Sequence, residues 1–311
     1  MRTQLPFAVL AAAVVCSLFT VSAHARARTF VASYGNDSNP CTFGSPCKTF
    51  QQAVNVVDAG GEVTAIDSAG FGPLVISHSV TITSPTGVEA GIVPTPGNDA
   101  IQIVAGSSDK IVLRGLTLEG NGSGNQGVAF DSGAALTVID CVVKDFSSNS
   151  GGILVDPSGT SHVTITNTVL SNNGYGVFYS SASGSNVIMV LNHVTATDNG
   201  HGLYFFGFNP STTDVAISNS VVSNNSVGID VTGNGGALTV SVDNTTLNGN
   251  GTAIFGLSPA AVMLSRSVIQ GNGVGTNNQT SNTFYTYSNN LIDLNGQNFM
   301  GGALYSGVTL R

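Results

Sequence analysis

The sequence predicts an all-β, single-domain parallel β-helix, and three observations lead to this fold. A repeat of 22 to 27 residues recurs from residue 110 onward. Apolar and polar residues alternate within each repeat, which is typical of a β-strand with one buried face. Asn, Asp and Gly mark the turns between the strands, because these residues tolerate the left-handed backbone conformation of tight turns.

The repeats align on eight anchor residues, which we expect to occupy the same turn in successive coils. Apolar residues stand two and four positions before most anchors and two positions after them, as Val163, Ile165 and Val169 do around Asn167. We expect these apolar positions to face the core and the anchor amides to stack in a ladder. The anchors are Arg114, Asp140, Asn167, Asn192, Asn219, Asn244, Arg266 and Asn289.

One such repeat cannot bury its own apolar face, so the repeats must stack. Stacking at the strand spacing of about 4.8 Å buries that face continuously and pairs each strand with the one a coil later. Three short strands fit a repeat of about 25 residues, whereas a propeller blade needs roughly 40. The repeat therefore predicts a parallel β-helix.

The repeats also carry a family resemblance. Segments N-T-V-L-S-N-N-G-Y-G-V (167–177) and N-S-V-V-S-N-N-S-V-G-I (219–229) resemble the coils of right-handed parallel β-helix proteins, a group that includes pectate-lyase-like enzymes. Segment 35–53 resembles their opening, where a first strand leads to a short helix. The resemblance implies a right-handed parallel β-helix of about ten coils with an N-terminal capping helix at 49–57. It implies no single activity, because the same fold hosts lyases, hydrolases, epimerases, esterases and inert surface proteins.

Three segments are expected along the chain. Residues 1–27 combine a basic start, an apolar stretch and small residues, which predicts a signal peptide. Residues 28–59 hold the first strand, a loop closed by a Cys41–Cys47 disulfide and the capping helix, and residues 60–311 form the β-helix. A local disulfide suits an exported chain, so we expect a secreted or periplasmic protein. Cys141 remains single and is expected to pack in the structure.

The composition limits the choice of partners. The chain has 9 basic and 17 acidic residues, and only 8% of its residues are charged. An acidic protein repels polyanions, so we expect no nucleic-acid partner. The leader's apolar stretch is too short to span a bilayer and no later segment is apolar enough, so we expect no membrane insertion. A neutral surface rich in hydroxyl and amide groups favours a polysaccharide or cell-surface glycan, bound by a monomer.

The segment D-N-G-H-G (198–202) resembles the Gly-His-Gly signature of polygalacturonases. The glycines, however, recur at the same turn in other coils, as in N-G-Y-G-V (173–177), and His201 fills a position that varies between coils. The other polygalacturonase segments, N-T-D, an Asp-Asp pair and R-I-K, are absent. We therefore interpret the glycines as structural, and the catalytic residues, if the protein is an enzyme, remain unknown.

A lyase would need a base and a group that neutralises a uronate carboxylate. Lys144, Arg114 and Arg266 are the possible bases, and Asp131 and Asp156 are weak calcium candidates on adjacent coils. Two carboxylates are few for a calcium site, and carboxylates solvated at turns explain Asp131 and Asp156 better. We expect no metal or cofactor, with calcium as the open alternative.

Outward-facing aromatic residues gather in the middle coils. Met189 and Leu191 are also expected to face outward. Alternatively, a long turn after Phe208 covers the aromatic residues, which then form a small separate hydrophobic core. An exposed aromatic band predicts a glycan-binding or partner-binding surface. The alternatives are a carbohydrate-active enzyme (a polysaccharide lyase or glycoside hydrolase) and a purely structural envelope protein. The ligand-binding candidates are Tyr175, Phe178, His201, Tyr204 and Phe206.

Overall fold

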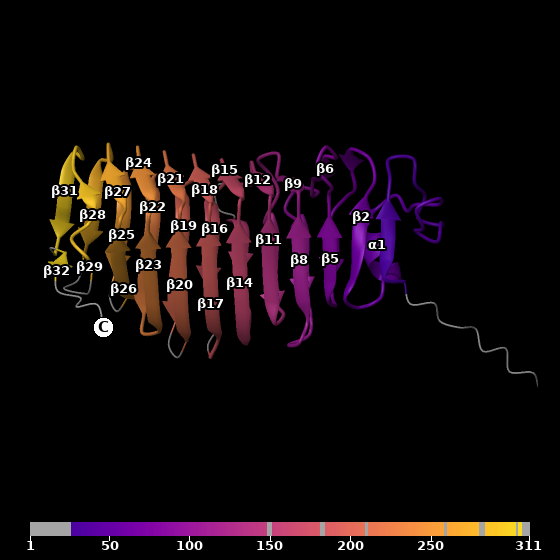
Figure 1. The fold of residues 1–311 in the computed structure, drawn as a ribbon, viewed down its shortest axis with the longest axis horizontal. Coiled ribbons are helices and arrows are strands. Elements are labelled where there is room, and N and C mark those ends of the chain that lie inside the picture. The colour runs from indigo at the N-terminus through magenta and orange to yellow at the C-terminus, as the bar shows by residue number, and fades with distance from the viewer. Residues whose placement is uncertain are drawn as a thin grey trace, which may run out of the picture.

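The computed structural model describes residues 26–147, 151–180, 184–208, 211–257, 260–279, 284–302 and 304–306. The expected signal peptide, 1–27, lies outside these residues except for its last two. The described strands follow one another along a single long axis, from the indigo N-terminal end to the yellow C-terminal end (Figure 1).

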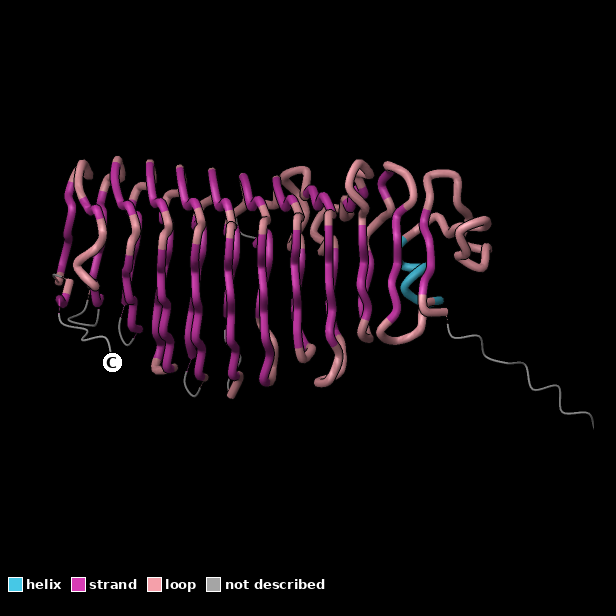
Figure 2. Tube along the Cα trace, in the orientation of Figure 1, coloured by secondary structure: helices cyan, strands magenta, loops and turns pink. Residues whose placement is uncertain are grey.

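Three parallel sheets run along this axis, and successive coils add strands to each sheet in turn. The strands lie side by side with those of the next coil (Figure 2). We name the sheets A, B and C in the order in which a coil visits them. Sheet A is formed by β1 (Arg28–Val31), β2 (Gly61–Ala65), β5 (Val80–Thr83), β8 (Lys110–Arg114), β11 (Ala135–Ile139), β14 (Thr160–Thr166), β17 (Asn186–Asn192), β20 (Thr212–Ser218), β23 (Ala237–Asp243), β26 (Ala260–Ser265), β29 (Phe284–Thr286) and β32 (Tyr305–Ser306).

Sheets B and C have ten described strands each, which confirms the predicted parallel β-helix of about ten coils. Sheet B is formed by β3 (Ala69–Gly70), β6 (Ala90–Ile92), β9 (Leu116–Glu119), β12 (Val142–Lys144), β15 (Val169–Ser171), β18 (Thr195–Thr197), β21 (Val221–Ser223), β24 (Thr246–Asn248), β27 (Val268–Gln270) and β30 (Leu291–Ile292). Sheet C is formed by β4 (Leu74–Ile76), β7 (Ile101–Val104), β10 (Val128–Ser132), β13 (Gly151–Val155), β16 (Tyr175–Ser180), β19 (His201–Phe208), β22 (Val227–Asn234), β25 (Thr252–Leu257), β28 (Val274–Asn278) and β31 (Gln297–Gly301).

A short helix, α1 (Phe50–Val56), lies at the N-terminal end of the stack, as predicted (Figure 2). The Thr49 side chain accepts a hydrogen bond from Gln52 N and so caps the helix. The Gln51 side chain accepts from Val75 N at 2.7 Å and donates to Val75 O at 3.2 Å. Val75 belongs to β4, the first strand of sheet C, so α1 satisfies backbone groups at an otherwise open sheet edge.

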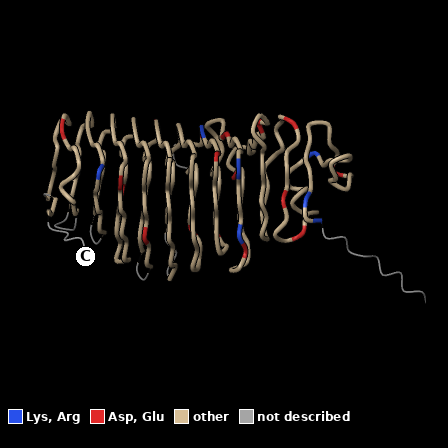
Figure 3. Tube along the Cα trace, in the orientation of Figure 1, with Lys and Arg blue, Asp and Glu red and all other residues tan. Residues whose placement is uncertain are grey.

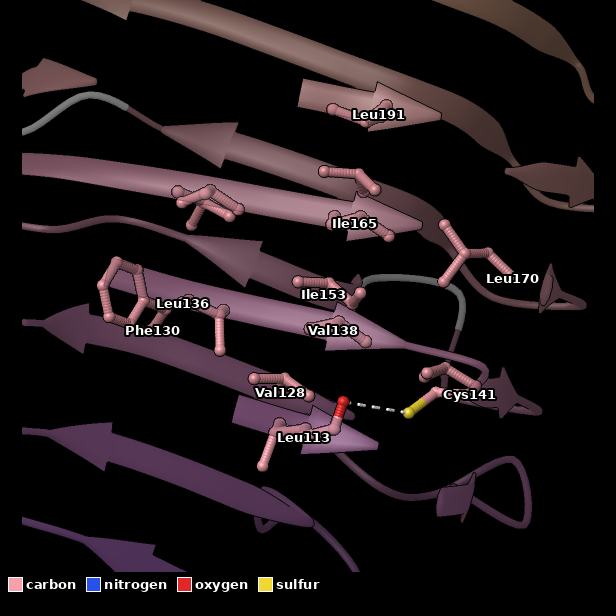
Figure 4. Packing of buried hydrophobic residues seen from close by; sticks show 14 of the residues in the cluster. Leu113, Val128, Phe130, Leu136, Val138, Cys141, Ile153, Ile165, Leu170 and Leu191 are labelled. Carbon is pink, nitrogen blue, oxygen red and sulfur yellow. Dashed lines mark hydrogen bonds between the residues drawn. The ribbon is translucent and has the colours of Figure 1, made fainter. Parts of the chain in front are cut away.

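The expected disulfide is present between Cys41 and Cys47. Cys141 is a buried free thiol whose Sγ lies 3.7 Å from Leu113 O (Figure 4). Burial raises the pKa of this thiol to about 11, which disfavours the reactive thiolate. Its surroundings fit the expected packing role.

The core is a stack of apolar columns between the sheets. Ile165 and the residues in register with it on the neighbouring strands of sheet A are almost completely buried. Figure 4 labels one such column, formed by Leu113, Val138, Ile165 and Leu191. No helix in the described part of the chain has the length and apolarity of a membrane span.

The anchor alignment was wrong by one residue in three coils. The left-handed turn residue is Gly115 rather than Arg114, His193 rather than Asn192, and Ser288 rather than Asn289. His and Ser stand where Asn was expected, and either can adopt this conformation at a turn. On the strands before these turns the inward and outward residues are therefore exchanged, whereas Leu116 and Val194, two positions after the anchors, are buried as expected.

On β17 this one-residue shift of the anchor reverses which side chains face the core. Met189 and Leu191 were expected to face outward, yet both are fully buried. Ile188 and Val190 are instead 48% and 40% exposed. Residues 188–191 are all apolar. The sequence pattern alone therefore did not decide whether Met189 and Leu191 or Ile188 and Val190 face the core.

The apolar residues two positions after the anchors were also expected in the core, and this was wrong for most of them. Val169 and Val221 are 37% and 41% exposed, whereas Thr168 and Ser220, directly after their anchors, are buried. The left-handed anchor residue bends the chain, so the alternation restarts one residue earlier on the other side of the turn.

The predicted ladder of anchor amides forms in part. Asn219 Nδ2 donates to Asn192 Oδ1 at 2.8 Å, and Asn244 Nδ2 donates to Asn219 Oδ1 at 2.7 Å. A longer buried ladder, which the sequence did not reveal, follows the turn between sheets B and C. There each Nδ2 donates to the next Oδ1 at 2.9–3.1 Å, through Asn173, Asn199, Asn225, Asn250, Asn272 and Asn295.

Candidate ligand-binding site

The outer face of sheet C brings together the five ligand-binding candidates of the sequence. Strands β16 and β19 are neighbours, and in their register Tyr175 pairs with His201, Phe178 with Tyr204, and Ser180 with Phe206. We call this set the aromatic cluster: Tyr175, Phe178, His201, Tyr204 and Phe206.

The glycines of the N-G-x-G turns allow the coils below the cluster to approach closely. A Cβ on Gly176 would lie 2.4 Å from Gly202 O, and one on Gly202 would lie 2.6 Å from Gly228 O. Neither distance leaves room for a Cβ, so close stacking favours glycine at these two turns, although Ala253 fills the same position in a later coil. This agrees with the interpretation of the Gly-His-Gly segment as structural.

The rings of the cluster are mutually packed. The Phe178 and Tyr204 centroids are 5.1 Å apart with planes only 6° from parallel, and Tyr175 stacks on Phe178 at 5.0 Å. Rings lying edge to edge in one plane cannot approach so closely, so these rings overlap as an offset stack. The rings therefore face one another in part, and a ligand meets their edges and uncovered face areas.

The cluster is half-buried. Tyr175, Phe178, Tyr204 and Phe206 all have intermediate exposure. Phe208, which packs edge-on against Phe206 with centroids 4.6 Å apart, is 38% exposed. The turn that was the alternative cover falls partly outside the described residues, at 209–210. In the described part of the chain the cluster thus offers a continuous, partly accessible apolar strip.

A carboxylate lies beside these rings, on the next coil. Asp230 on β22 pairs in register with Tyr204 and faces outward, yet is only 7% exposed. Its Oδ2 lies 3.2 Å from His201 Nδ1, an ion-pair distance that lacks hydrogen-bond alignment, and its Oδ1 accepts from Thr232 Oγ1 at 2.8 Å. Asp230 was not among the candidate residues that the sequence identified. Its burial depends on residues of the neighbouring coils, so the spacing of residues within one coil could not reveal it.

The electrostatics of the cluster favour a neutral phenol. Burial, followed by the nearby charge of Asp230 and the neighbouring Tyr175, raises the pKa of Tyr204 to about 12. A hydrogen bond with Thr232 offsets this in part. Tyr204 is therefore protonated and uncharged at neutral pH.

The weak calcium candidates lie on the same face of sheet C, one and two coils before the cluster. Asp131 in β10 accepts a hydrogen bond from Gln102 Nε2 at 2.9 Å. Asp156 directly follows β13, and burial together with the charge of Asp131 raises its pKa. The two carboxylates are thus close enough to repel each other. Among the described residues, no group of three or more His, Cys, Asp or Glu side chains is arranged to hold a metal ion.

The possible lyase bases lie away from this face. Lys144 ends β12 in sheet B, where its Nζ lies 3.4 Å from Glu119 and 3.6 Å from Asp145. Arg114 ends β8 in sheet A, and Arg266 follows β26 and pairs with Asp243. The structure does not bring these bases together with Asp131 and Asp156 on one strand face.

Comparison with known proteins gives the same architecture. Residues 64–213 match a family model described as "right handed beta helix region". The structure is similar to the A-module of the mannuronan C-5 epimerase AlgE4 of Azotobacter vinelandii, with a TM-score of 0.51 and 17% identity over 80% of this chain and 91% of that one.

Two further solved structures are similar. A complex of XylC with xylose has a TM-score of 0.58 and 8% identity, over 85% of this chain and 69% of that one. The pectate lyase Pel9A has a TM-score of 0.51 and 15% identity, over 79% of each chain. No curated protein matches the sequence. At these identities the likeness concerns the fold alone.

Proposed function

We propose that this chain, a right-handed parallel β-helix protein with a pectate-lyase-like fold, binds a polysaccharide or cell-surface glycan outside the cytoplasm. The proposed contact surface is the aromatic cluster on sheet C. The observation that carries the proposal is the half-buried, offset-stacked pair of Phe178 and Tyr204 on adjacent coils.

Sugar rings have apolar C–H faces and polar rims, so they suit an apolar strip with polar groups beside it. Phe178, Tyr204 and Phe206 supply the strip. The Tyr204 hydroxyl and the His201 ring supply hydrogen-bonding groups at its edge. Because the cluster spans two coils about 4.8 Å apart, an extended chain laid along the axis would meet several of its rings.

The remaining surface is consistent with this proposal. The chain has only 8% charged residues, so an uncharged ligand meets little competing electrostatic field. Two of the similar structures are a polysaccharide epimerase and a pectate lyase, and a third is a complex with xylose. Export is supported by the Cys41–Cys47 disulfide, since such bonds persist in oxidising compartments.

A glycan array with a double variant tests the proposal. Phe178→Ala combined with Tyr204→Ala removes the stacked pair and should abolish binding that the unchanged chain shows. The matched control is Tyr285→Ala with Tyr305→Ala, which removes a second aromatic pair, with centroids 6.4 Å apart, from sheet A. Binding that survives the first double variant, or that both double variants lose equally, contradicts a site at the cluster.

A carbohydrate-active enzyme is the second candidate function, favoured by the proximity of Asp230 to His201 and Tyr204 of the cluster. A histidine beside a buried carboxylate is one arrangement that transfers protons. Neutral and anionic polysaccharides can be screened for new reducing ends and for absorbance from unsaturated uronates, with and without calcium. Turnover lost in Asp230→Asn, in the Asp131/Asp156 pair variant or in a Lys144 variant would favour an enzyme over a binding protein.

A further inference from the structure

We infer that the glycan bound at the aromatic cluster carries protonated amino groups. This inference rests on the proposed function and extends it by naming the chemical class of the ligand. It is drawn from the distribution of charge on the outer face of sheet C around the cluster.

The ten described strands of sheet C carry no Lys or Arg, and the basic side chain of the cluster, His201, already lies 3.2 Å from the Asp230 carboxylate. No Lys or Arg occurs anywhere in the sequence between Lys144 and Arg266, the stretch that includes the whole cluster. Figure 3 shows the middle coils almost free of blue. An anionic sugar bound at this face would therefore find no Lys or Arg among the strands that carry the site, and His201 already faces a carboxylate.

Acidic side chains, in contrast, lie on both sides of the cluster along the axis. Asp131 and Asp156 precede it on the two coils that carry β10 and β13, and Asp230 follows it on β22. In the described part of the chain neither Asp131 nor Asp156 forms an ion pair with Lys, Arg or His. Their mutual repulsion is therefore not neutralised by the protein, and a bound cation would relieve it.

The rings themselves discriminate by charge. The face of an aromatic ring carries negative potential, so it attracts cations and disfavours anions. Tyr204 stays a neutral phenol and adds no charge of its own. Leu154 of β13 pairs with Phe178, so Asp156 stands two residues further along, in the row of Ser180 and Phe206. An ammonium group bound between Asp156 and these rings would lie near a carboxylate and an aromatic ring.

These observations predict an order of affinity. A sugar with an ammonium group gains the cation–ring and carboxylate contacts, a neutral sugar gains only the apolar contacts, and a uronate is repelled by the three carboxylates. A basic peptide would supply cations without a sugar's apolar ring faces. The row of packed rings favours the glycan over such a peptide.

Calorimetric titration of the full chain with three oligosaccharides of equal length tests this order. The probes are a glucosamine oligomer, its N-acetylated counterpart and an oligogalacturonate, at a mildly acidic pH that protonates the amines. The glucosamine oligomer should bind about fivefold more tightly than the N-acetylated one, and added salt should reduce this difference. Asp156→Asn should remove most of the difference. Asp214→Asn, the same charge change on an exposed position of sheet A, should leave it unchanged.

The outcomes separate this inference from the proposed function. Equal binding of the amino and N-acetylated oligomers, or tightest binding of the oligogalacturonate, overturns the amine and leaves glycan binding standing. A lysine oligopeptide that binds more tightly than the glucosamine oligomer overturns the assignment of the ligand as a glycan. If no oligosaccharide binds and the glycan array is also negative, the proposed function itself is wrong.

Discussion

His201 and Asp230 meet across two adjacent coils, with Nδ1 of the histidine 3.2 Å from Oδ2 of the carboxylate. The contact exists because β19 and β22 are paired so that Tyr204 lies beside Asp230. Thr232 holds the other carboxylate oxygen at 2.8 Å. The aromatic cluster therefore has a carboxylate beside it, and the charge of this carboxylate adds to burial in raising the pKa of Tyr204.

Tyr204 gives the fold a measurable sensitivity to alkaline pH. Its pKa is raised to about 12 in the folded state, mainly by burial, against about 10 in an unfolded chain. Between these values the unfolded chain has lost the proton that the folded state keeps. The stability contributed by the neutral phenol is thus complete below about pH 10 and is lost as the pH rises through about 12.

Tyr204→Phe removes this ionisation and so tests its effect. From pH 10 to 12 the free energy of unfolding of the unchanged chain should fall relative to that of the variant, by at most about 1.4 kcal/mol per pH unit. Denaturant titrations at pH 8, 10 and 11 measure the difference. Parallel pH profiles for the two proteins would show that Tyr204 titrates as an exposed tyrosine does.

Substitution of two neighbouring apolar residues of β17 should affect stability very differently. Met189 is fully buried and Ile188 is 48% exposed. Met189→Ala should lower the free energy of unfolding by about 2–4 kcal/mol, whereas Ile188→Ala should change it by less than about 1 kcal/mol. Thermal and denaturant unfolding of the two variants measures the difference. A larger loss from Ile188→Ala would restore the register first expected from the sequence.

The same strand shows which parts of the fold could be predicted from the sequence and which could not. The repeat predicted the sheets and the coil stacking, because hydrophobic alternation and turn residues recur in every coil. The family resemblance of segment 35–53 implied the N-terminal helix. The repeat failed at β17, where all of 187–191 are apolar and His193 takes the turn position expected for Asn192. When both faces of a strand are apolar, only its pairing with neighbouring strands decides which face is buried.

The site was predictable to a similar extent. Outward columns in the sequence identified Tyr175, Phe178 and Tyr204, and the structure brings their rings together. The overlap of the rings and the burial of Asp230 were not predictable from the sequence. Both depend on side-chain directions across neighbouring coils, which are set by packing rather than by position in one repeat.

The buried amide ladder should contribute strongly to stability. Asn199 Oδ1 accepts from Asn173 N at 3.0 Å, and Asn199 Nδ2 donates to Leu170 O at 3.0 Å and to Asn225 Oδ1 at 3.1 Å. Asn199→Ala leaves these groups buried without a partner, and each such loss costs about 1–3 kcal/mol. The midpoint of denaturant unfolding should therefore fall clearly.

Asn186→Ala is the matched control for the ladder, because Asn186 is exposed at the start of β17. It should change stability by less than about 0.5 kcal/mol. Equal effects of the two substitutions would mean that water replaces the lost ladder bonds of Asn199, and the ladder would then carry little of the stability.

Two consecutive residues of the Gly-His-Gly segment, His201 and Gly202, are expected to have different roles, one in ligand binding and one in coil stacking. A Cβ on Gly202 would lie 2.6 Å from Gly228 O, so Gly202→Ala must push two coils apart and should cost at least about 2 kcal/mol. His201 has no such constraint, since Val227 occupies the register position beside it on the next coil. His201→Val should therefore keep stability within about 1 kcal/mol while removing the partner of Asp230. If His201→Val unfolds the protein as Gly202→Ala does, the histidine is structural. If it leaves the fold intact and weakens glycan binding, the histidine serves the ligand and the glycines serve the stack.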